Sequence, residues 1–330
     1  MTDLTYLTDH YDKKIERINE IGAPLNFIFI TDMHNRLREF CEPWSDKKGF
    51  ELAVNAVNSM QYIIDRCPID CVVNGGDTGN DYDFDPKKFY ASHEEISDAL
   101  YNLSVPAHNL IGNHDDGIGT AKDRGNKVDD FAILPQKLHK LYMKNNPTDK
   151  NYYYHNFDDK GFRFVFLNTS DLPYVKDENG EYFFHWRLEI SNEQAIWFEE
   201  EALKTEKNII VFSHAPIHTA GIVGSLGSPK CINPYDDVLN APRVYYNIKK
   251  SENVVATISG HVHYDNLLYD DNMLTVTTAS AFADYFLPTC PKREYKTYTE
   301  TAFDVFSIKD NVMYITRFGA GEDRIAPILR

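Results

Sequence analysis

Leu110-Ile111-Gly112-Asn113-His114-Asp115-Asp116-Gly117 places an amide, an imidazole and two carboxylates directly after one glycine. The stretch continues a short apolar run that begins at Ala107, after the turn signal at Pro106, which is typical of a buried strand opening into a loop. In open α/β sheets, binding sites form at this edge. The same residue types are also common in ordinary polar turns. Whether this stretch forms a binding site or an ordinary turn therefore depends on the residues at the ends of the other strands.

Four further apolar runs end in similar side chains. Residues 25–30 lead into Asp32 and His34, residues 70–74 into Asp77, residues 208–212 into His214, and residues 253–259 into His261 and His263. A single histidine beside a strand is more often a hydrogen-bonding residue than a ligand. Five strand ends that all carry such side chains are hard to explain by chance, so we expect them to meet in one site.

The order of the predicted elements indicates the fold class. Helical spacing of apolar residues over 51–65 and about 86–103 alternates with the first three strands, which indicates a parallel sheet with right-handed crossovers. From Tyr152 onward strand follows strand, with a hairpin turn at 158–161. The sequence therefore predicts a second sheet that is more antiparallel.

The domain organisation follows from the absence of repeats and linkers. We expect a single domain over residues 1–330. Within it, residues 215–250 are expected to form an insertion over the active site, because their first half is rich in Gly, Ser and Pro. Residues 281–299 are expected to form a loop, whose aromatic side chains could either contact a ligand or pack in the core.

Charge and composition restrict the partners. The chain has 34 Lys+Arg against 50 Asp+Glu, a formal net charge of -16, and such a surface repels polyanions. Nucleic acid is therefore not an expected partner. The polar first twenty residues do not resemble a secretory signal, and no apolar run approaches the ~20 residues of a membrane span. Five cysteines without a CxxC pair favour reduced thiols and a cytoplasmic protein. The oligomeric state stays open.

The side chains at the strand ends form a set of potential metal ligands: Asp32, His34, Asp77, Asn113, His214, His261 and His263. Imidazole, carboxylate and amide ligands without a thiolate suit Mn, Fe or Zn. The set exceeds the three or four protein ligands of one catalytic zinc, which indicates two metals about 3.5–4 Å apart with a bridging carboxylate. Two-metal sites are typical of phosphoryl chemistry.

These motifs resemble, in order, the five motifs of the calcineurin-like metallophosphoesterases: Asp-x-His at 32–34, Gly-Asp at 76–77, Gly-Asn-His-Asp at 112–115, His214, and Gly-His-Val-His at 260–263. The resemblance implies an α/β fold of four layers, in which two mixed β-sheets pack as a sandwich with flanking helices. It also implies one metal at Asp32, His34, Asp77 and His263, and a second at Asp77, Asn113, His214 and His261. Asp77 would be the bridge.

The expected reaction is hydrolysis of a phosphoester by in-line attack of a metal-bridging hydroxide. His114 is the expected proton donor to the leaving group, a role worth about 10²–10⁴ in rate. Asp115 or Asp116 could orient that imidazole, or the two could form a solvated turn. His218, Asp116 and Asn80 are candidate substrate contacts, since they follow or adjoin the motifs.

The substrate class is less well defined by the motifs. The protein-phosphatase branch of the family has Gly-Asp-x-x-Asp-Arg-Gly, whereas Asp77 here is followed by Thr78-Gly79-Asn80-Asp81 and the arginine is missing. This argues against a Ser/Thr protein phosphatase. Residues 112–116 resemble the small-molecule phosphodiesterases of the superfamily, which implies a small-molecule phosphodiester as substrate, with a phosphomonoesterase or protein phosphatase as the alternative. A catalytically idle, metal-bound scaffold protein is an alternative of another class. An idle member would be expected to lack a ligand or His114, and the sequence retains all of them.

Overall fold

The computed structural model describes residues 5–35, 47–79, 85–182, 187–218, 238–282 and 290–330. The helices are α1 (Thr5–Ile21), α2 (Lys47–Ile64), α3 (Pro86–Tyr101), α4 (Ile118–Asp123), α5 (Val128–Phe131), α6 (Pro135–Tyr142), α7 (Asn192–Trp197) and α8 (Ala241–Lys250), with a π-helical turn η1 (Phe198–Ala202) after α7 and a 3₁₀ turn η4 (Tyr298–Glu300).

The strands form two six-stranded sheets. The first has the order β14 (Arg324–Pro327), β13 (Val312–Gly319), β12 (Ala302–Lys309), β1 (Leu25–Ile30), β2 (Cys71–Asn74) and β3 (Ala107–Asn109). The second has the order β10 (Asn266–Asp270), β11 (Met273–Thr277), β9 (Val254–Ser259), β7 (Asn208–Ser213), β5 (Phe162–Leu167) and β4 (Tyr153–Phe157). A short parallel pair joins β6 (Leu188–Glu189) to β8 (Val238–Leu239).

Both sheets mix parallel and antiparallel pairing. The strands β1, β2 and β3 are parallel, and β12 to β14 continue that sheet with antiparallel pairs. In the second sheet β5, β7, β9 and β11 are parallel, while the outer strands β4 and β10 are antiparallel to their neighbours. The predicted change from a parallel to a more antiparallel pattern is therefore only partly right. The first sheet is parallel from β1 to its β3 edge and antiparallel on the other side, whereas the second sheet has a parallel centre and antiparallel edges.

An aromatic core joins the two sheets face to face. The ring of Phe27 on β1 lies 4.9 Å from that of Phe164 on β5, 5.6 Å from Phe212 on β7 and 5.0 Å from Phe306 on β12, centroid to centroid. All four side chains are fully buried. Because successive strand residues point to opposite faces, Ile28 faces the other way. It packs in a separate apolar cluster with residues of α1, α2 and α3.

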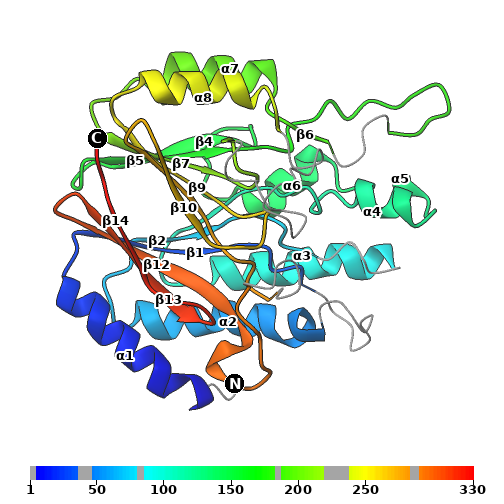
Figure 1. The fold of residues 1–330 in the computed structure, drawn as a ribbon. Coiled ribbons are helices and arrows are strands. Elements are labelled where there is room, and N and C mark those ends of the chain that lie inside the picture. The colour runs from blue at the N-terminus through cyan, green and yellow to red at the C-terminus, as the bar shows by residue number, and fades with distance from the viewer. Residues whose placement is uncertain (1–4, 36–46, 80–84, 183–186, 219–237, 283–289) are drawn as a thin grey trace.

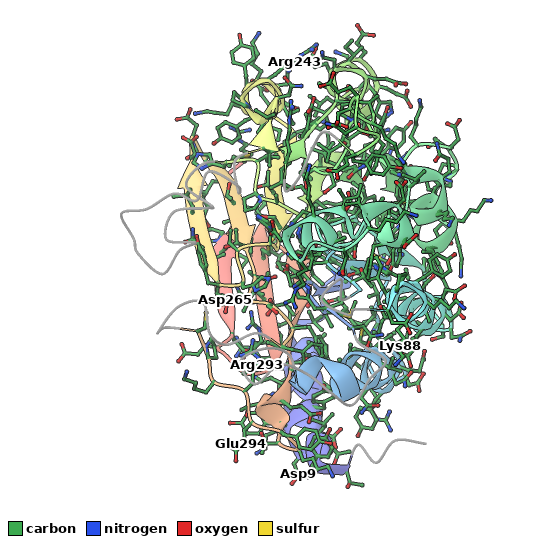
Figure 2. The ribbon with its side chains drawn as sticks, turned by 90° about the vertical axis from the view of Figure 1, so that its right-hand side faces the viewer. Asp9, Lys88, Arg243, Asp265, Arg293 and Glu294 are labelled. Carbon is green, nitrogen blue, oxygen red and sulfur yellow. The ribbon has the colours of Figure 1, made fainter. Side chains whose placement is uncertain are left out.

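Helices cover the outer faces and complete four layers (Figure 1). The helices α1, α2 and α3 pack on the first sheet, and α7 and α8 pack on the second. In Figure 2 the labelled Asp9 of α1 and Arg243 of α8 mark these two outer layers at opposite ends of the view. The helix α7 begins with a side-chain cap, since the Ser191 hydroxyl accepts a hydrogen bond from the backbone N–H of Gln194. The predicted α/β sandwich is confirmed.

Two segments singled out in the sequence are only partly described. In the segment 215–250, β8 pairs with β6, and α8 buries Ala241, Val244 and Ile248 against the second sheet. These residues cover the outer face of that sheet. Residues 219–237 lie outside the described residues, so an insertion over the site stays a prediction for them. In the segment 281–299, Phe282 is buried in the apolar cluster of α1 and α2, and 283–289 are outside the described residues.

No helix in the described part of the chain is both long and apolar enough to cross a membrane. Three of the five cysteines belong to this part, and Cys67, Cys71 and Cys290 are all buried free thiols.

Candidate metal centre

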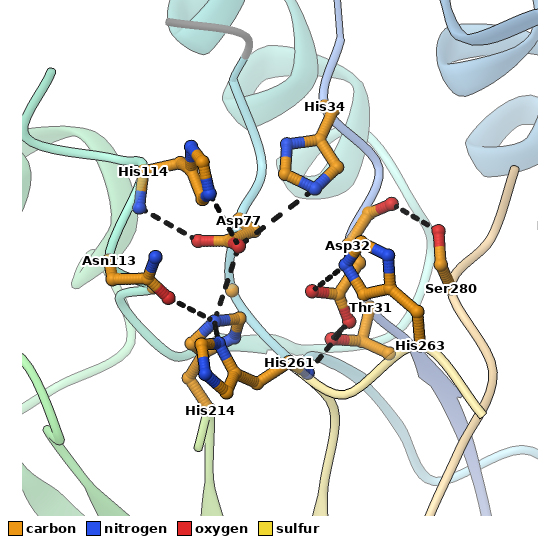
Figure 3. A network of polar contacts seen from close by, with 12 residues as sticks. Thr31, Asp32, His34, Asp77, Asn113, His114, His214, His261, His263 and Ser280 are labelled. Atoms are coloured by element: carbon orange, nitrogen blue, oxygen red, sulfur yellow. Dashed lines mark hydrogen bonds and ion pairs between the residues drawn. The ribbon is translucent and has the colours of Figure 1, made fainter. Parts of the chain in front are cut away.

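The parallel strands of both sheets end in polar side chains. Figure 3 shows these side chains gathered in one network of polar contacts. From the first sheet come Asp32 and His34 after β1, Asp77 after β2, and Asn113 with His114 after β3. From the second sheet come His214 after β7, and His261 with His263 after β9. The structure therefore brings together all seven predicted metal ligands and His114.

The loops that carry these side chains are tied to one another by backbone hydrogen bonds. Asp32 N–H donates to Gly76 O (3.0 Å) and His34 N–H donates to Asp77 O (2.9 Å), which extends the β1–β2 pairing beyond the strand ends. Gly260 N–H donates to His214 O (3.0 Å) and does the same for the second sheet. The positions of the ligands thus follow from the sheets, whose cores are rigid.

Five of the candidate ligands have left-handed backbone conformations. The φ angles are +55° for Asp32, +45° for His34, +50° for Asp77, +67° for His261 and +61° for His263. Non-glycine residues seldom adopt this region, and such residues cluster at functional sites. The backbone is therefore bent at each of these positions in a way that turns the side chain toward the centre of the cluster.

Asp77 lies at the centre of the cluster. Its Oδ2 is 3.3 Å from His214 Nε2, 3.9 Å from His34 Nε2 and 4.0 Å from His114 Nε2. Its Oδ1 accepts a hydrogen bond from the backbone N–H of His114 (2.9 Å). One carboxylate thus faces histidines from three different loops, which is the position a bridging ligand needs.

Asp32 and His263 form the part of the cluster beside β1 and β9. His263 Nε2 lies 3.0 Å from Asp32 Oδ1, while Asp32 Oδ2 accepts hydrogen bonds from Thr31 Oγ1 (2.7 Å) and the backbone N–H of His261 (3.0 Å). Potential ligand atoms of Asp32, His34, Asp77 and His263 all lie within 4.8 Å of one another. These four residues could hold one metal ion.

A second group lies around His214. Its Nδ1 donates to the backbone carbonyl of Gly75 (2.8 Å), which leaves Nε2 as the lone-pair nitrogen of the neutral ring. This Nε2 lies 3.1 Å from Asn113 Oδ1 and 3.2 Å from His261 Nδ1. Atoms with lone pairs at such distances repel one another unless a proton or a cation lies between them.

The pKa values of the buried carboxylates and of His214 also indicate that the cluster requires positive charge. Although burial lowers it, the neighbouring Asp77 carboxylate raises the pKa of His214 to about 9. Burial raises the pKa values of Asp77 and Asp32, but the imidazoles of His214 and His263 hold these two pKa values below the ordinary range. The buried carboxylates are thus kept ionised by the neighbouring imidazoles, and metal ions can supply the positive charge that such carboxylates need.

The residues present therefore fit two metal ions. Potential ligand atoms of Asp77, His214 and His261 also lie within 4.8 Å of one another, so that Asp77 belongs to both groups. All three are imidazole or carboxylate donors, the types that suit Mn, Fe or Zn. The hydrogen bond of His214 Nδ1 to a backbone carbonyl is the usual way in which a ligating histidine is oriented.

His114 lies at the rim of the cluster. Its side chain is 16% exposed, in contrast to the fully buried His214. Its ring meets the His34 ring edge-on with 5.1 Å between the centroids. The His114 imidazole can therefore reach both the cluster and a group that enters from solvent.

The environment of Asp115 differs from both predicted alternatives, which were a solvated turn and support of the His114 imidazole. It is fully buried, and its carboxylate accepts hydrogen bonds from the backbone N–H groups of Gly112 (2.7 Å), Thr78 (2.7 Å), Asp77 (3.1 Å) and Gly79 (3.3 Å). The solvated-turn alternative is wrong for this residue. Support of the His114 imidazole does not match these contacts either, because both oxygens are directed at the backbone of the loops.

Asp116 is also buried, with 6% of its surface exposed, so the solvated turn is wrong here too. One oxygen accepts from the backbone N–H of Ile118 (2.8 Å) and the other from the Tyr174 hydroxyl (3.1 Å). The residue thus fixes the start of α4.

The structure does not bring His218 to the cluster. Its Nε2 lies 3.3 Å from Asp270 Oδ2, and its ring packs against that of Tyr245 on α8. Asp270 pairs with Met273 at the end of the sheet opposite to the end that carries His261. Asn80 lies outside the described residues.

Residues other than the candidate ligands also shape the site. A Cβ on Gly260 would lie 2.0 Å from Thr31 Oγ1, and one on Gly112 would lie 2.1 Å from Asp77 Oδ1, so both loops approach their neighbours too closely for any other residue. His93 on α3 lies with Nδ1 3.8 Å from Asp115 Oδ1. Only the glycines within the motifs could have been found from the sequence.

A four-layer α/β sandwich with a histidine and aspartate cluster at the carboxyl ends of its strands defines the class of metal-dependent phosphoesterases. The family model of the calcineurin-like phosphoesterases matches residues 25–265, and the chain belongs to this family. It is a metal-dependent phosphoesterase, and the family implies a dinuclear metal centre. A search of curated proteins finds no match to the sequence.

Solved structures show the same fold at low sequence identity. A dimetal phosphatase from Danio rerio superposes with a TM-score of 0.61 at 16% identity, over 93% of this chain and 99% of that chain. GAP50, described as the anchor in the inner membrane complex of Plasmodium, superposes with a TM-score of 0.51 at 15% identity, over 92% of this chain and 88% of that chain. These similarities concern the fold.

Proposed function

We propose that this chain hydrolyses a small-molecule phosphoester, preferably a phosphodiester, with His114 as the proton donor to the leaving group. The observation that supports it most strongly is the placement of Asp77 between imidazoles of three loops, with His114 at the exposed rim. We also propose that residues 1–330 act as one domain, which is supported by the pairing of β1 with β12 within one sheet.

The proposed ligands of the first ion are Asp32, His34, Asp77 and His263, and those of the second are Asp77, Asn113, His214 and His261. When bound, two ions of Mn, Fe or Zn would supply positive charge to the phosphoryl oxygens and lower the pKa of water towards ~7. The protein's own part is to hold the ligand loops and to present a proton. The His114 backbone N–H bond to Asp77 fixes its imidazole beside the cluster.

The preference for a diester is supported by charge. A phosphodiester carries one negative charge, whereas a monoester at neutral pH carries close to two. A chain with a net charge of -16 repels the more highly charged ester more strongly. The Danio rerio structure is named a dimetal phosphatase, so a monoester belongs in the same assay.

The test of His114 compares two leaving groups. His114→Ala should lower kcat for an alkyl phosphodiester by about 10²–10⁴, because the alkoxide leaves poorly without a proton. The loss should be much smaller for bis-p-nitrophenyl phosphate, whose p-nitrophenolate leaves unaided. His139→Ala is the control, since His139 lies on α6 and bonds to Asn151. Equal losses for both esters would rule out the role of His114 as proton donor.

The reaction itself is tested by metal dependence. The wild-type chain is assayed with Mn²⁺, Fe²⁺ and Zn²⁺ on bis-p-nitrophenyl phosphate and p-nitrophenyl phosphate, with and without a chelator. Turnover that the chelator abolishes is the expected result. No turnover with any metal and either ester would favour a catalytically idle scaffold.

A further inference from the structure

A small recess adjoins the metal centre on the side of Asn113. Its walls include Asn113, Asp116, Ser170 and Arg187. The accessible volume is about 10 Å³, which is room for one water-sized group. The recess can therefore receive a single atom of a larger substrate, but not a whole phosphate group.

Ser170 presents a buried hydroxyl to this recess. The residue is 3% exposed, and its Oγ has no hydrogen-bond partner among the described residues. Buried hydroxyls are nearly always hydrogen-bonded, because an unpaired one loses its bonds to water without replacement. An unpaired hydroxyl at the wall of a recess beside the metal centre indicates that a ligand atom or a water completes it.

Arg187 adds a positive charge to the same recess. Its Nη2 lies 2.7 Å from Glu189 Oε2, and its side chain is 34% exposed. A guanidinium carries five N–H donors in a planar fork, so it can bind the Glu189 carboxylate and a further oxygen together.

The backbone places Ser170 beside Glu189, two residues after Arg187. Glu189 N–H donates to Thr169 O (2.8 Å), and Asp171 N–H donates to Glu189 O (3.0 Å). The segments that contain Ser170 and Arg187 are therefore paired like neighbouring strands. The two oxygens of the Asp116 carboxylate accept from Ile118 and Tyr174.

We propose that Ser170 and Arg187 form a subsite that binds one phosphoryl oxygen of the substrate beside Asn113. Both groups are donors and one carries a positive charge, which matches an anionic oxygen better than a neutral hydroxyl. The subsite selects substrates whose phosphoryl group is unsubstituted at this oxygen. It rests on the proposed function and adds two substrate-binding residues outside the family motifs.

The test uses Arg187→Gln, Arg187→Lys and Ser170→Ala. With bis-p-nitrophenyl phosphate and Mn²⁺, Arg187→Gln should raise KM about tenfold with kcat changed less than about threefold, because a contact made equally in the ground and transition states acts on KM. Ser170→Ala should raise KM about threefold. Arg187→Lys keeps the positive charge and should raise KM less than Arg187→Gln does. The dissociation constant of inorganic phosphate, measured by titration calorimetry, should rise in parallel.

Arg243→Gln is the matched control. It breaks an Arg–Glu ion pair of the same kind, between Arg243 and Glu199 on the outer helices. If Arg187 serves only Glu189, Arg187→Gln will shift the melting temperature as the control does and leave both KM and phosphate affinity unchanged, which overturns the subsite. Absence of turnover in the wild-type chain would instead reject the proposed function, while the phosphate titration still tests the subsite.

Discussion

The replacement Asp115→Asn tests whether this carboxylate holds the ligand loops together. In the structure Oδ1 accepts from Thr78 (2.7 Å) and Gly79 (3.3 Å), and Oδ2 accepts from Gly112 (2.7 Å) and Asp77 (3.1 Å). An asparagine has only one acceptor oxygen. Whichever way the amide is oriented, its NH₂ group faces two backbone N–H donors.

The magnitude follows from these two lost bonds. A buried donor left without a partner costs about 1–3 kcal/mol, so two cost about 2–6 kcal/mol. Burial, together with the neighbouring Asp77, raises the pKa of Asp115 to about 7. The neutral amide avoids this cost of burying a charge, and the expected loss is therefore at the lower end, about 2–4 kcal/mol. For a chain of this length that lowers the melting temperature by about 3–6 °C.

The assay is thermal unfolding at pH 8, where the wild-type carboxyl is ionised, with and without Mn²⁺. Because Gly112 and Asp77 are both held by Asp115, the variant should also show a smaller Mn²⁺-induced rise in melting temperature. Asp116→Asn is the control. Its amide oxygen can still accept from Ile118, and its NH₂ can donate to the Tyr174 hydroxyl, so the expected loss is at most about 1 kcal/mol. Equal melting temperatures for both variants would refute the reasoning.

Three further outcomes are expected. Gly112→Ala would place a Cβ 2.1 Å from Asp77 Oδ1, so it should lower stability by about 1–3 kcal/mol and kcat at least 100-fold; near-normal turnover would show that the loop can adjust. Burial lowers the pKa of His108 to about 3, so the unfolded chain binds a proton near pH 6.5 before the folded chain does. Stability should therefore fall by up to about 1.4 kcal/mol per pH unit below 6.5, and His108→Gln should flatten the urea-denaturation midpoints between pH 6.5 and 5; an unchanged slope contradicts this. Mn²⁺ added to chelator-treated protein should stabilise it by about 2.7 kcal/mol at a hundred times the dissociation constant, and no change in melting temperature with Mn²⁺, Fe²⁺ or Zn²⁺ would contradict a metal site.

The sequence was sufficient to predict the meeting of the ligands, because parallel strands in one sheet place their carboxyl ends at one edge. The sequence was not sufficient to predict the contacts of Asp115. Apart from Gly112, the partners of this carboxylate are the backbone N–H groups of residues 77–79, among which Thr78 lies 37 residues away, and no residue type marks a backbone donor.

His218 shows another limit of prediction from the sequence. It follows His214 by four residues, and sequence proximity alone suggested a contact with the substrate. The intervening Ile217 is buried in the apolar cluster on the outer face of the second sheet, which directs the chain away from the metal centre. Burial of one apolar side chain thus decides the direction of the chain, and single-sequence periodicity does not show it over so short a segment.

The geometry of the cluster explains why a folded chain would retain such an unfavourable site. The left-handed backbone at Asp32, Asp77 and His261 costs free energy in the folded state, and so does the burial of the Asp32 and Asp77 carboxylates. The two apolar clusters that enclose the first sheet supply stability independently of this site. A bound cation would offset the cost of the buried carboxylates. The fold therefore maintains ligand positions that are unfavourable by themselves, and the cost is recovered on metal binding.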